Sequence, residues 1–463
     1  MQPFFENIVL IYIMNILLFS WSALGANVGQ FILSFSILIL LHEFGHFITA
    51  KWFGCRVEKF YLFFDPWFSL WKKKIGETIY GLGWIPLGGY VKISGMIDES
   101  MDKEQMKQPP QPYEFRSKPA WQRLIIMLAG VILNLLLAFA IFAMMLFVWG
   151  EQKLPVANIQ YGLAADSLAL KVGIKDGDLI TKVNGETLVY QDDLPKKMLL
   201  SEKVSLTIDR GGKDTVINFP PGFLKELTKN QLKNFVSIRM PNIVDTIDAS
   251  KINYTSGELK KGDQIIAIDS ISVPFYNDFI RAVKNFKNQA VTITVLRNGA
   301  DTAKVGVKLD ENGKVGYGNN AYKLLNFEKK EYGFFEALPA GIKMGVTKLN
   351  EYIGGIKLLF TSKEHNVNDN LGSVISIGKT FGGVWDWERF WLMTGIFSII
   401  LAFMNVLPIP ALDGGHALFT LIEMVTGRKP SDKFMEYAQM FGMILLLGLM
   451  AYALGLDIFR LFK

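Results

Sequence analysis

Long apolar runs alternate with polar stretches along the chain, and four of these runs are long enough to cross a lipid bilayer. They lie at residues 28–53, 124–149, 391–408 and 438–456. An α-helix rises about 1.5 Å per residue, so about 20 apolar residues span the hydrocarbon core. The second run is almost wholly apolar, with Asn134 as its only strongly polar residue. We therefore predict about four core transmembrane helices.

The first 27 residues hold a weaker apolar stretch at 8–24, which polar residues interrupt. A signal peptide would account for the small residues that follow it, but signal peptides begin with basic residues and the first basic residue here is Lys51. We predict that this N-terminal apolar extension, residues 1–27, forms an extra transmembrane or interfacial helix, with a signal peptide as the alternative.

An internal repeat occupies the polar stretch between the second and third apolar runs. Residues 173–185 read GIKDGDLITKVNG, and residues 258–270 read ELKKGDQIIAIDS. In each copy a Gly-Asp turn precedes an alternating apolar run, and a second run typical of a strand follows, VSLTIDR at 204–210 and VTITVLR at 291–297. This layout predicts two small β-rich domains in tandem, at residues 151–240 and 241–325.

The segment between the repeat and the third apolar run, residues 326–390, contains one helical stretch. Residues 333–361 have the pattern of a helix that lies on the membrane or on the tandem domains, and a plain linker helix is the alternative. The remaining segments of the predicted organisation are residues 28–123 (first core helix, a cytoplasmic loop and a hairpin), 124–150 (second helix) and 391–463 (third and fourth helices).

Composition agrees with a membrane protein that has a sizeable water-exposed part. Of the 463 residues, 50% are hydrophobic and 20% charged, and the mean hydropathy is +0.24. The net charge is +6, but no base-reading motif accompanies it, so no nucleic-acid partner is expected. The single cysteine, Cys55, excludes an intrachain disulfide and is interpreted as a packing residue.

Charge also predicts the orientation in the membrane. Between Lys51 and Arg123 there are 12 Lys or Arg against 8 Asp or Glu, and three of the lysines are adjacent at 72–74. Positive charge is enriched in cytoplasmic loops, which puts this loop in the cytoplasm and residues 150–390 outside. Arg428 and Lys429, after the third helix, return to the cytoplasmic side.

The sequence His42-Glu43-Phe44-Gly45-His46 carries the clearest chemical signal. On a helix, residues i and i+4 share a face, so both imidazoles reach one metal ion, and Glu43 is placed to accept a proton. Two helical histidines without a metal are the alternative. The motif follows the apolar run FILSFSILILL, where an ionisable residue costs at least ~2.5 kcal/mol and is usually functional. The setting therefore favours a metal site.

A catalytic zinc site needs a third protein ligand and keeps its fourth position for water. Asp413, in NVLPIPALDGGH at 405–416, is the best candidate, because Pro408 and Pro410 break the helix and two glycines permit a sharp turn. His416 is the rival ligand, and a helix N-cap is the non-catalytic alternative for Asp413. The fourth histidine, His365, is expected to be a solvated loop residue.

These motifs together resemble the site-2 protease family, the intramembrane zinc metalloproteases of M50 type. HEFGH in a first transmembrane helix and NxxPxPxLDG in a late one are its core, and GLGWIPLGGYVKISG at 81–95 is similar to its membrane-dipping β-hairpin. The repeats look like its tandem PDZ domains, and LDIFRL at 456–461 fits its C-terminal end. Gly130-Val131 and Gly372-Ser373 stand where many members of the family would have Gly-Pro, and the second repeat has Asp269-Ser270 where the first has Asn184-Gly185.

The resemblance implies a polytopic α-helical membrane protein with a membrane-associated β-hairpin and two β-rich PDZ-like domains on the periplasmic side. It implies Zn²⁺ bound by His42, His46 and Asp413, with Glu43 as general base. Asn405 would contact the substrate, with a helix–helix hydrogen bond as the alternative. Further substrate-binding residues would be Gly81, Gly83, Ile85, Pro408 and Pro410, because an exposed strand can pair with an unwound substrate; a purely structural hairpin is the alternative.

The expected activity is hydrolysis of peptide bonds in or near the transmembrane segments of other proteins. The substrates would be single-span proteins of the bacterial inner membrane, of the anti-sigma-factor type, together with signal-peptide remnants, cut near the cytoplasmic side after an upstream site-1-type protease. The alternatives are a non-catalytic PDZ scaffold and a prenyl-protein-processing type of zinc protease, whose third ligand would be a glutamate.

Overall fold

The computed structural model describes residues 21–96, 109–229, 235–248, 252–319, 324–362 and 372–461. The chain divides into two compact units. The first comprises Met1–Gly150, Glu331–Gly354 and Leu371–Lys463, and the second comprises Glu151–Lys330 and Gly355–Asn370.

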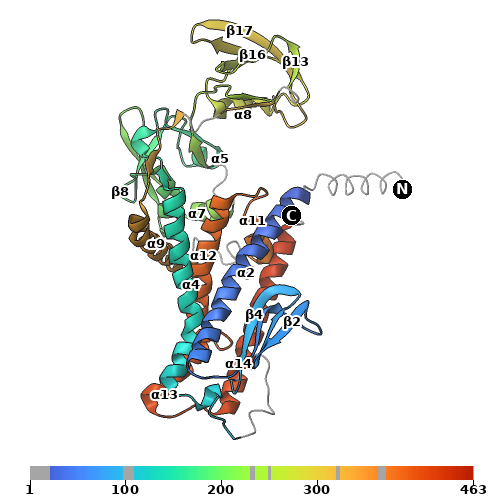
Figure 1. Cartoon of the computed structure of the whole chain (residues 1–463). Coiled ribbons are helices and arrows are strands. Elements are labelled where there is room, and N and C mark those ends of the chain that lie inside the picture. Colours follow the sequence, from blue (N-terminus) through green and yellow to red (C-terminus); the bar gives the residue numbers. More distant parts are fainter. Residues whose placement is uncertain are drawn as a thin grey trace, which may run out of the picture. The chain divides into compact units, whose positions relative to one another are not determined.

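Four long helices build the first unit (Figure 1), namely α2 (Trp21–Trp52), α4 (Ala120–Val148), α12 (Trp387–Val406) and α14 (Asp432–Leu461). All four are long and apolar enough to span a membrane, which confirms the prediction of four such helices. Helix α2 begins at Trp21 rather than at residue 28. The remainder of the predicted N-terminal extension, residues 1–20, lies outside the described part of the chain.

Glycines allow the helices of the first unit to approach closely. A Cβ on Gly45 of α2 would lie 2.6 Å from the carbonyl oxygen of Ala129 on α4, and a Cβ on Gly395 of α12 would lie 2.9 Å from the ring of Phe142. In a bilayer there is no hydrophobic driving force between helices, so van der Waals contact between closely packed backbones stabilises their association. Small residues at the contact allow this close approach. Helix α4 therefore packs directly against both α2 and α12.

The helix expected at 333–361 is present as α9 (Phe334–Thr361). Its part in the first unit packs on α4, because Gly341 lies against the backbone of Ala143 and Gly345 lies against the ring of Phe139. The sequence pattern did not predict α4 as its partner.

A four-stranded sheet covers part of α2 and corrects one prediction. Its strands are β1 (Val57–Phe64), β2 (Trp71–Ile75), β3 (Thr78–Leu82) and β4 (Ile85–Ile93), in the order β2-β3-β1-β4. The predicted hairpin over residues 81–95 is wrong, because β1 lies between β3 and β4; the hairpin is β2–β3 instead. Gly83 lies against the carbonyl oxygen of Phe64, and this close approach lets the chain pass the end of β1.

The C-terminal helix α14 is tied to the short helix α11 (Val374–Lys379). Asp457 of α14 is buried and accepts hydrogen bonds from the backbone N–H and the hydroxyl of Ser373, at 2.9 and 2.6 Å, and from the hydroxyl of Ser376 at 2.7 Å. At Gly372-Ser373, where the sequence departs from the family, the serine thus supplies two hydrogen bonds that a proline lacks.

The second unit contains two β-rich modules, each with its own buried core. The strands of the first module are β7 (Leu179–Val183), β8 (Glu186–Thr187), β9 (Ser205–Asp209) and β10 (Asp214–Asn218), which form a sheet in the order β10-β9-β7-β8. A separate pair consists of β6 (Leu163–Ala165) and β11 (Val236–Ile238). The main sheet of the second module has five strands, in the order β13-β17-β16-β14-β15. They are β13 (Asn253–Ser256), β14 (Gln264–Ile268), β15 (Ile271–Ser272), β16 (Ala290–Arg297) and β17 (Asp301–Lys308), with β12 (Thr246–Ile247) paired to β18 (Tyr317–Gly318).

The two modules repeat the same buried ion pair. Asp178 is 1% exposed and accepts two hydrogen bonds from Arg210, and Asp263, also 1% exposed, accepts two from Arg297. Each aspartate belongs to the Gly-Asp turn that marks the sequence repeat. Arg210 directly follows β9, and Arg297 is the last residue of β16. The repeated polar anchor supports the interpretation of the sequence as a tandem duplication.

A helix of the second module, α8 (Tyr276–Val283), contacts the first module. Arg281 donates to the carboxylate of Asp176 at 2.7 and 3.1 Å and to the carbonyl oxygen of Ala165 at 2.7 Å. These hydrogen bonds lower the pKa of the Asp176 carboxyl. Arg281 therefore links the two modules through a charge-assisted, bidentate contact.

Candidate metal centre

The HEFGH motif lies within the helix α2, at a point where two other elements of the first unit approach it. His42 and His46 are 8% and 7% exposed and lie one turn apart on the same face. Gly45, between them, is the residue that lets α4 approach. The two imidazoles are therefore held between α2 and α4, away from bulk water.

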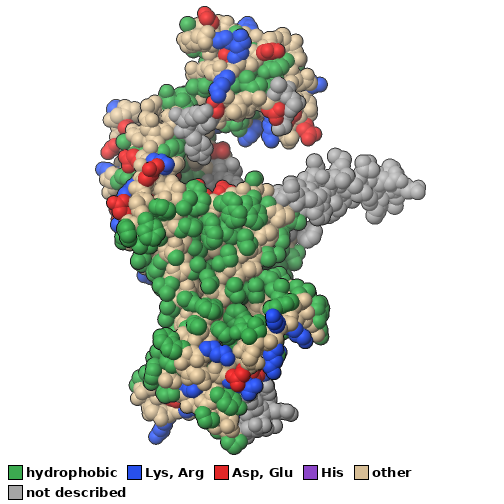
Figure 2. All heavy atoms as spheres, in the orientation of Figure 1, with side chains coloured by type: hydrophobic (Ala, Val, Ile, Leu, Met, Phe, Trp, Pro, Cys, Tyr) green, Lys and Arg blue, Asp and Glu red, His purple; other side chains and the backbone are tan. Residues whose placement is uncertain are grey.

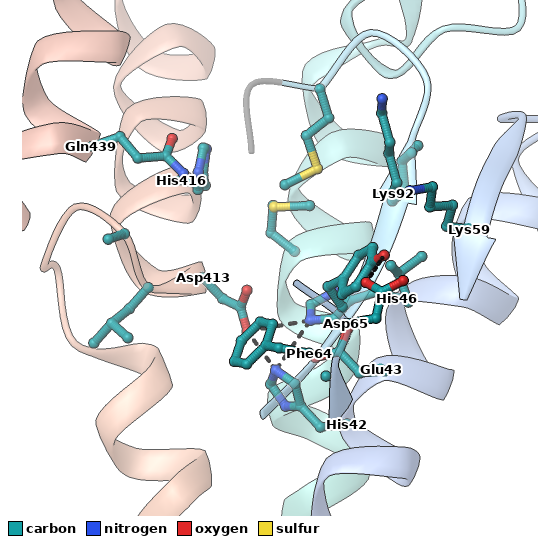
Figure 3. Close-up of a pocket in the computed structure, with 18 of the residues that line it drawn as sticks. His42, Glu43, His46, Lys59, Phe64, Asp65, Lys92, Asp413, His416 and Gln439 are labelled. Atoms are coloured by element: carbon teal, nitrogen blue, oxygen red, sulfur yellow. Dashed lines mark hydrogen bonds and ion pairs between the residues drawn. The ribbon is translucent and has the colours of Figure 1, made fainter. Parts of the chain in front are cut away.

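Asp413 brings a carboxylate to the same point. Its Oδ2 atom lies 3.1 Å from His42 Nε2 and 3.3 Å from His46 Nε2, and the two nitrogens are 3.3 Å apart. Zinc with ligands at 2.0–2.1 Å in tetrahedral geometry separates neighbouring ligand atoms by about 3.3 Å. The three atoms thus have the spacing of three corners of a zinc site (Figure 3).

Hydrogen bonding favours a lone pair, rather than a proton, on the inward nitrogen of His46. Its Nδ1 lies 2.8 Å from the carbonyl oxygen of Ile126, which can only accept, so Nδ1 carries the proton and Nε2 is free to bind a metal. Asp413 Oδ2 is buried and faces the two imidazole nitrogens, and among the described residues it has no hydrogen-bond partner. Three facing electron-pair donors fit a cation between them.

Asn134 of α4 occupies the outer side of His42. Its Nδ2 lies 3.2 Å from His42 Nδ1, and its Oδ1 is buried without a hydrogen-bond partner in the described part of the chain. Amide oxygen and nitrogen are distinguished only by their hydrogen bonds. When Nε2 of His42 binds a metal, its Nδ1 carries a proton. With the amide of Asn134 reversed, Oδ1 would accept a hydrogen bond from Nδ1–H, and neither group would be left without a partner.

The loop that delivers Asp413 is not helical. Helix α12 ends at Val406, and α13 (Asp413–Thr426) begins at Asp413, so the residue in the N-cap position is Leu412. The N-cap alternative for Asp413 is therefore excluded. Ala411, two residues earlier, has φ of 80°, a left-handed conformation that costs a non-glycine residue about 1–3 kcal/mol.

Glycine also makes room for the imidazoles. A Cβ on Gly130 of α4 would lie 2.5 Å from His46 Nε2 and 2.7 Å from His42 Cε1. On β4, a Cβ on Gly89 would lie 2.8 Å from Ile39 Cγ2 and 3.3 Å from Glu43 Cγ. One glycine opens the space for the metal ligands, and the other lets the sheet approach Glu43.

A cavity of about 710 Å³ opens beside the three ligand atoms. Figure 3 shows Asp413, His416 and Gln439 on one side of it and the residues of the sheet on the other. Its lining includes Glu43 of α2, Gly89 and Val91 of β4, and Met127 of α4. Since β4 is an edge strand of the sheet, its backbone borders the cavity.

The remaining residues that the sequence predicted to bind metal or substrate differ in their position relative to the cavity. Ile85 and His416 line the cavity, but His416 is not one of the three clustered ligand residues. Asn405, in the last turn of α12, has its Nδ2 3.3 Å from His42 Nε2. Five residues predicted to bind substrate are not among those that line the cavity: Asn405, Gly81, Gly83, Pro408 and Pro410. His365 lies outside the described residues.

Gly81 and Pro410 have close packing contacts in the folded chain. Gly81 lies directly under the ring of Tyr61, so a side chain there would displace the tyrosine. The carbonyl oxygen of Pro410 lies against Gly442 of α14, which holds the loop before Asp413 onto that helix.

An HExxH motif and a distant aspartate that converge among four helices of membrane-spanning length define a membrane metallopeptidase. The chain matches the model of peptidase family M50 over residues 30–449 and belongs to that family; it is a zinc metalloprotease. It is similar to the regulator of sigma E protease of Haemophilus influenzae, with 30% identity over 96% of this chain and 100% of the relative. It is also similar to the regulator of sigma-E protease RseP of Escherichia coli, with 28% identity over 94% and 99%.

Sequence reasoning did not single out Asn134, Gly130 or Gly89 as part of the site. Asn134 had a visible signal, because a strongly polar residue in an otherwise apolar helix is expensive and usually has a partner. The two glycines had no such signal. Their importance follows only from what faces them in the folded chain.

Proposed function

We propose that this protein is an intramembrane protease in which His42, His46 and Asp413 hold the zinc ion. The single observation that carries the proposal is the triangle of two imidazole nitrogens and one carboxylate oxygen with sides of 3.1–3.3 Å. A catalytic zinc site has three protein ligands and one open position. The adjoining cavity supplies the space for water and substrate at that position.

Glu43 is the proposed general base. It lies next to His42 in the sequence and lines the cavity. Zinc in such a site lowers the pKa of water towards 7 and polarises a carbonyl group. The Glu43 carboxylate accepts a proton from the attacking water and returns it to the amine of the leaving half of the substrate. The water oxygen bonds to the carbonyl carbon and the C–N bond breaks, which balances the hydrolysis.

Asn405 and Asn134 have different proposed tasks beside His42. The Asn405 amide approaches Nε2, the nitrogen that faces the other ligands, so it is positioned to donate to the substrate carbonyl oxygen. Asn134 approaches Nδ1, on the outer side, and its reversed amide would orient the imidazole by accepting a hydrogen bond from Nδ1–H. Asn405 would thus contact the substrate, and Asn134 would orient the metal-binding imidazole of His42.

The edge strand β4 is the proposed binding surface for the substrate backbone. A transmembrane helix hides its carbonyl groups in internal hydrogen bonds and must unwind before it is cut. An edge strand offers replacement hydrogen bonds by strand addition, and β4 borders the cavity that contains Glu43. Of the predicted substrate-binding residues, Ile85 of β4 lines the cavity and is a proposed contact, whereas Gly81 and Gly83 are not part of its lining.

The proposed biological role is the second cut in regulated intramembrane proteolysis. The substrates would be single-span membrane proteins that an upstream protease has already trimmed, and two relatives are named as regulators of a sigma factor. We propose that the two β-rich modules are PDZ-like domains on the periplasmic side of a bacterial inner membrane, where they exclude untrimmed substrates. The metal centre would lie near the cytoplasmic face.

The test compares zinc content and cleavage of a tagged single-span substrate in liposomes for three forms of the protein. We expect the wild type to cut, Glu43→Gln to retain zinc without cutting, and Asp413→Ala to lose both. Cleavage by Glu43→Gln at the wild-type rate would exclude the proposed general base. A zinc-loaded but inactive wild type would favour the alternative, a membrane scaffold that works through its β-rich modules.

A further inference from the structure

The four-stranded sheet has a basic face that the proposed protease mechanism does not use. Lys72 and Lys74 of β2 lie two residues apart and therefore point to the same side of the strand. Lys74 pairs with Ile79 of β3, which pairs with Lys59 of β1, so the three side chains form a row across that side. Lys72 belongs to the next row, opposite Gly81.

The opposite face of the same sheet is occupied. Lys73 pairs with Tyr80, which pairs with Phe60. The rings of Phe60 and Tyr80 lie 5.2 and 5.9 Å from that of Phe47 on α2, so this side packs against the helix. The lysine face is thus the free side of the sheet, and Figure 2 shows Lys and Arg side chains over the sheet below the hydrophobic surface of the helices.

A cavity of about 420 Å³ lies on this free face. Lys59, Lys72 and Lys74 line it, and within the described chain none of the three ammonium groups has a carboxylate partner at ion-pair distance. One carboxylate, Asp65, borders the cavity, but it accepts hydrogen bonds from Ser69 at 2.9 Å and Tyr90 at 2.9 Å. The cavity therefore carries an excess of positive charge.

Exposed aromatic side chains border the cavity. Trp67 is 91% and Phe68 is 56% exposed, and both rings stack on Trp84, at 6.1 and 5.6 Å. The backbone of Trp67 has φ of 72°, a conformation that is strained for a bulky residue. Neighbouring Leu70 and Trp71 are also more than half exposed.

Lysines beside exposed indole rings match the chemistry of a membrane surface. Trp side chains concentrate at the level of lipid headgroups, and lysines close to the bilayer attract anionic lipids. We propose that the cavity lined by Lys59, Lys72 and Lys74 binds the phosphate of an anionic phospholipid, while Trp67 and Phe68 contact the acyl-chain boundary. Lys59 and Asp65 also line the cavity beside the metal centre, so the headgroup would lie next to the substrate site.

The test uses the full-length protein in an uncharged detergent, incubated with equal amounts of phosphatidylglycerol and phosphatidylcholine, and counts bound lipid by native mass spectrometry. We expect phosphatidylglycerol to be retained preferentially, and Lys72→Gln or Lys74→Gln to lower that preference by about fivefold each. Lys73→Gln is the matched control, because it removes the same charge from the same strand on the other face. It should leave the preference unchanged.

Three results would overturn the proposal. Equal retention of the two lipids would remove the role of headgroup charge. An equal loss in Lys73→Gln would mean that net charge, rather than this cavity, attracts the lipid. Displacement by inorganic phosphate at the same concentration as the lipid would show a site for free anions without a lipid component. Thermal unfolding of each variant in the same detergent checks that the fold is intact, as expected for exposed side chains.

Discussion

Gly130 of α4 faces His46 of α2 so closely that a Cβ on the glycine would lie 2.5 Å from His46 Nε2. At such a distance the added carbon and the ring nitrogen overlap, so either the glycine backbone or the imidazole would have to move. The space in which His42, His46 and Asp413 converge therefore exists because one position on the neighbouring helix has no side chain.

Gly130→Ala should weaken zinc binding by about tenfold or more. The added methyl group has to displace an imidazole in a packed interior, and overpacking of this kind costs about 1–3 kcal/mol. Competition with a chromophoric chelator measures the affinity. Gly448→Ala on α14 is the control, since nothing lies within 4 Å of a Cβ there. Unchanged zinc affinity in Gly130→Ala would contradict the proposed ligand geometry.

Asn134→Leu should lower zinc affinity by about 10- to 100-fold, the range for partners that orient a metal-bound histidine. Asn134→Asp should retain most of the affinity, because a carboxylate still accepts a hydrogen bond from His42 Nδ1–H. Thr394→Val removes another buried polar contact, the hydrogen bond of 2.9 Å to Ser34, and should leave zinc binding unchanged. Equal affinities for the Leu and Asp variants would mean that Asn134 does not orient His42.

Gly89→Ala should slow cleavage while zinc remains bound. The methyl group would press on Ile39 and on the side chain of Glu43, which moves the edge strand β4 or the general base, but neither is a proposed metal ligand. We expect kcat to fall by about tenfold at full zinc occupancy. Loss of zinc from this variant would place the perturbation at the metal ligands instead.

Removal of zinc should lower the thermal stability of the protein. A ligand that binds only the folded state stabilises it by about 4 kcal/mol when present at a thousand times its dissociation constant. Differential scanning in detergent, with zinc or with a chelator, should therefore give two different Tm values for the wild type and a single value for Asp413→Ala. A zinc-dependent Tm in Asp413→Ala would show that the metal binds elsewhere.

Arg281→Ala should loosen the contact between the two β-rich modules without unfolding either. Hydrogen–deuterium exchange should rise in the segments that carry the two partners, residues 175–177 and α8, while the cores around Ile180 and Ile265 stay protected. The exposed Lys261, which pairs with Asp245, provides the control variant Lys261→Ala. Increased exchange throughout both modules would instead assign Arg281 a role in folding.

The same contact has a defined pH dependence. Since Arg281 lowers the pKa of Asp176, the contact stabilises the folded unit above the ordinary aspartate pKa and is lost as the pH falls through the lowered value. The protection factors of residues 175–177 and of α8, corrected for the intrinsic pH dependence of amide exchange, should therefore be constant near neutral pH and fall only in strong acid.

Much of the architecture is visible in the sequence because it depends on local patterns. A run of about 20 apolar residues has to form a helix in a bilayer, where no water satisfies the backbone, so the four long helices could be predicted. The Gly-Asp turns with their alternating runs likewise predicted β7 and β14. The i, i+4 spacing of His42 and His46 follows from helical geometry alone.

The sheet shows where local patterns fail. Residues 81–95 have the glycines and the alternation of a hairpin, but β1 takes the place between β3 and β4. Strand order depends on which backbone edges meet after the chain has folded over α2, and no local pattern contains that information. For the same reason the sequence does not show that Gly81 lies against the ring of Tyr61.

The sequence by itself determined the residue types of the metal centre and the helix that carries two of them. The tertiary structure alone decided that Asp413, rather than His416, completes the cluster, that Asn134 lies against His42, and that Gly130 leaves the space for both imidazoles. Spacing along one helix is set by covalent geometry. Contacts between α2, α4 and α13 depend on how closely their surfaces pack, and this becomes defined only when the helices are assembled.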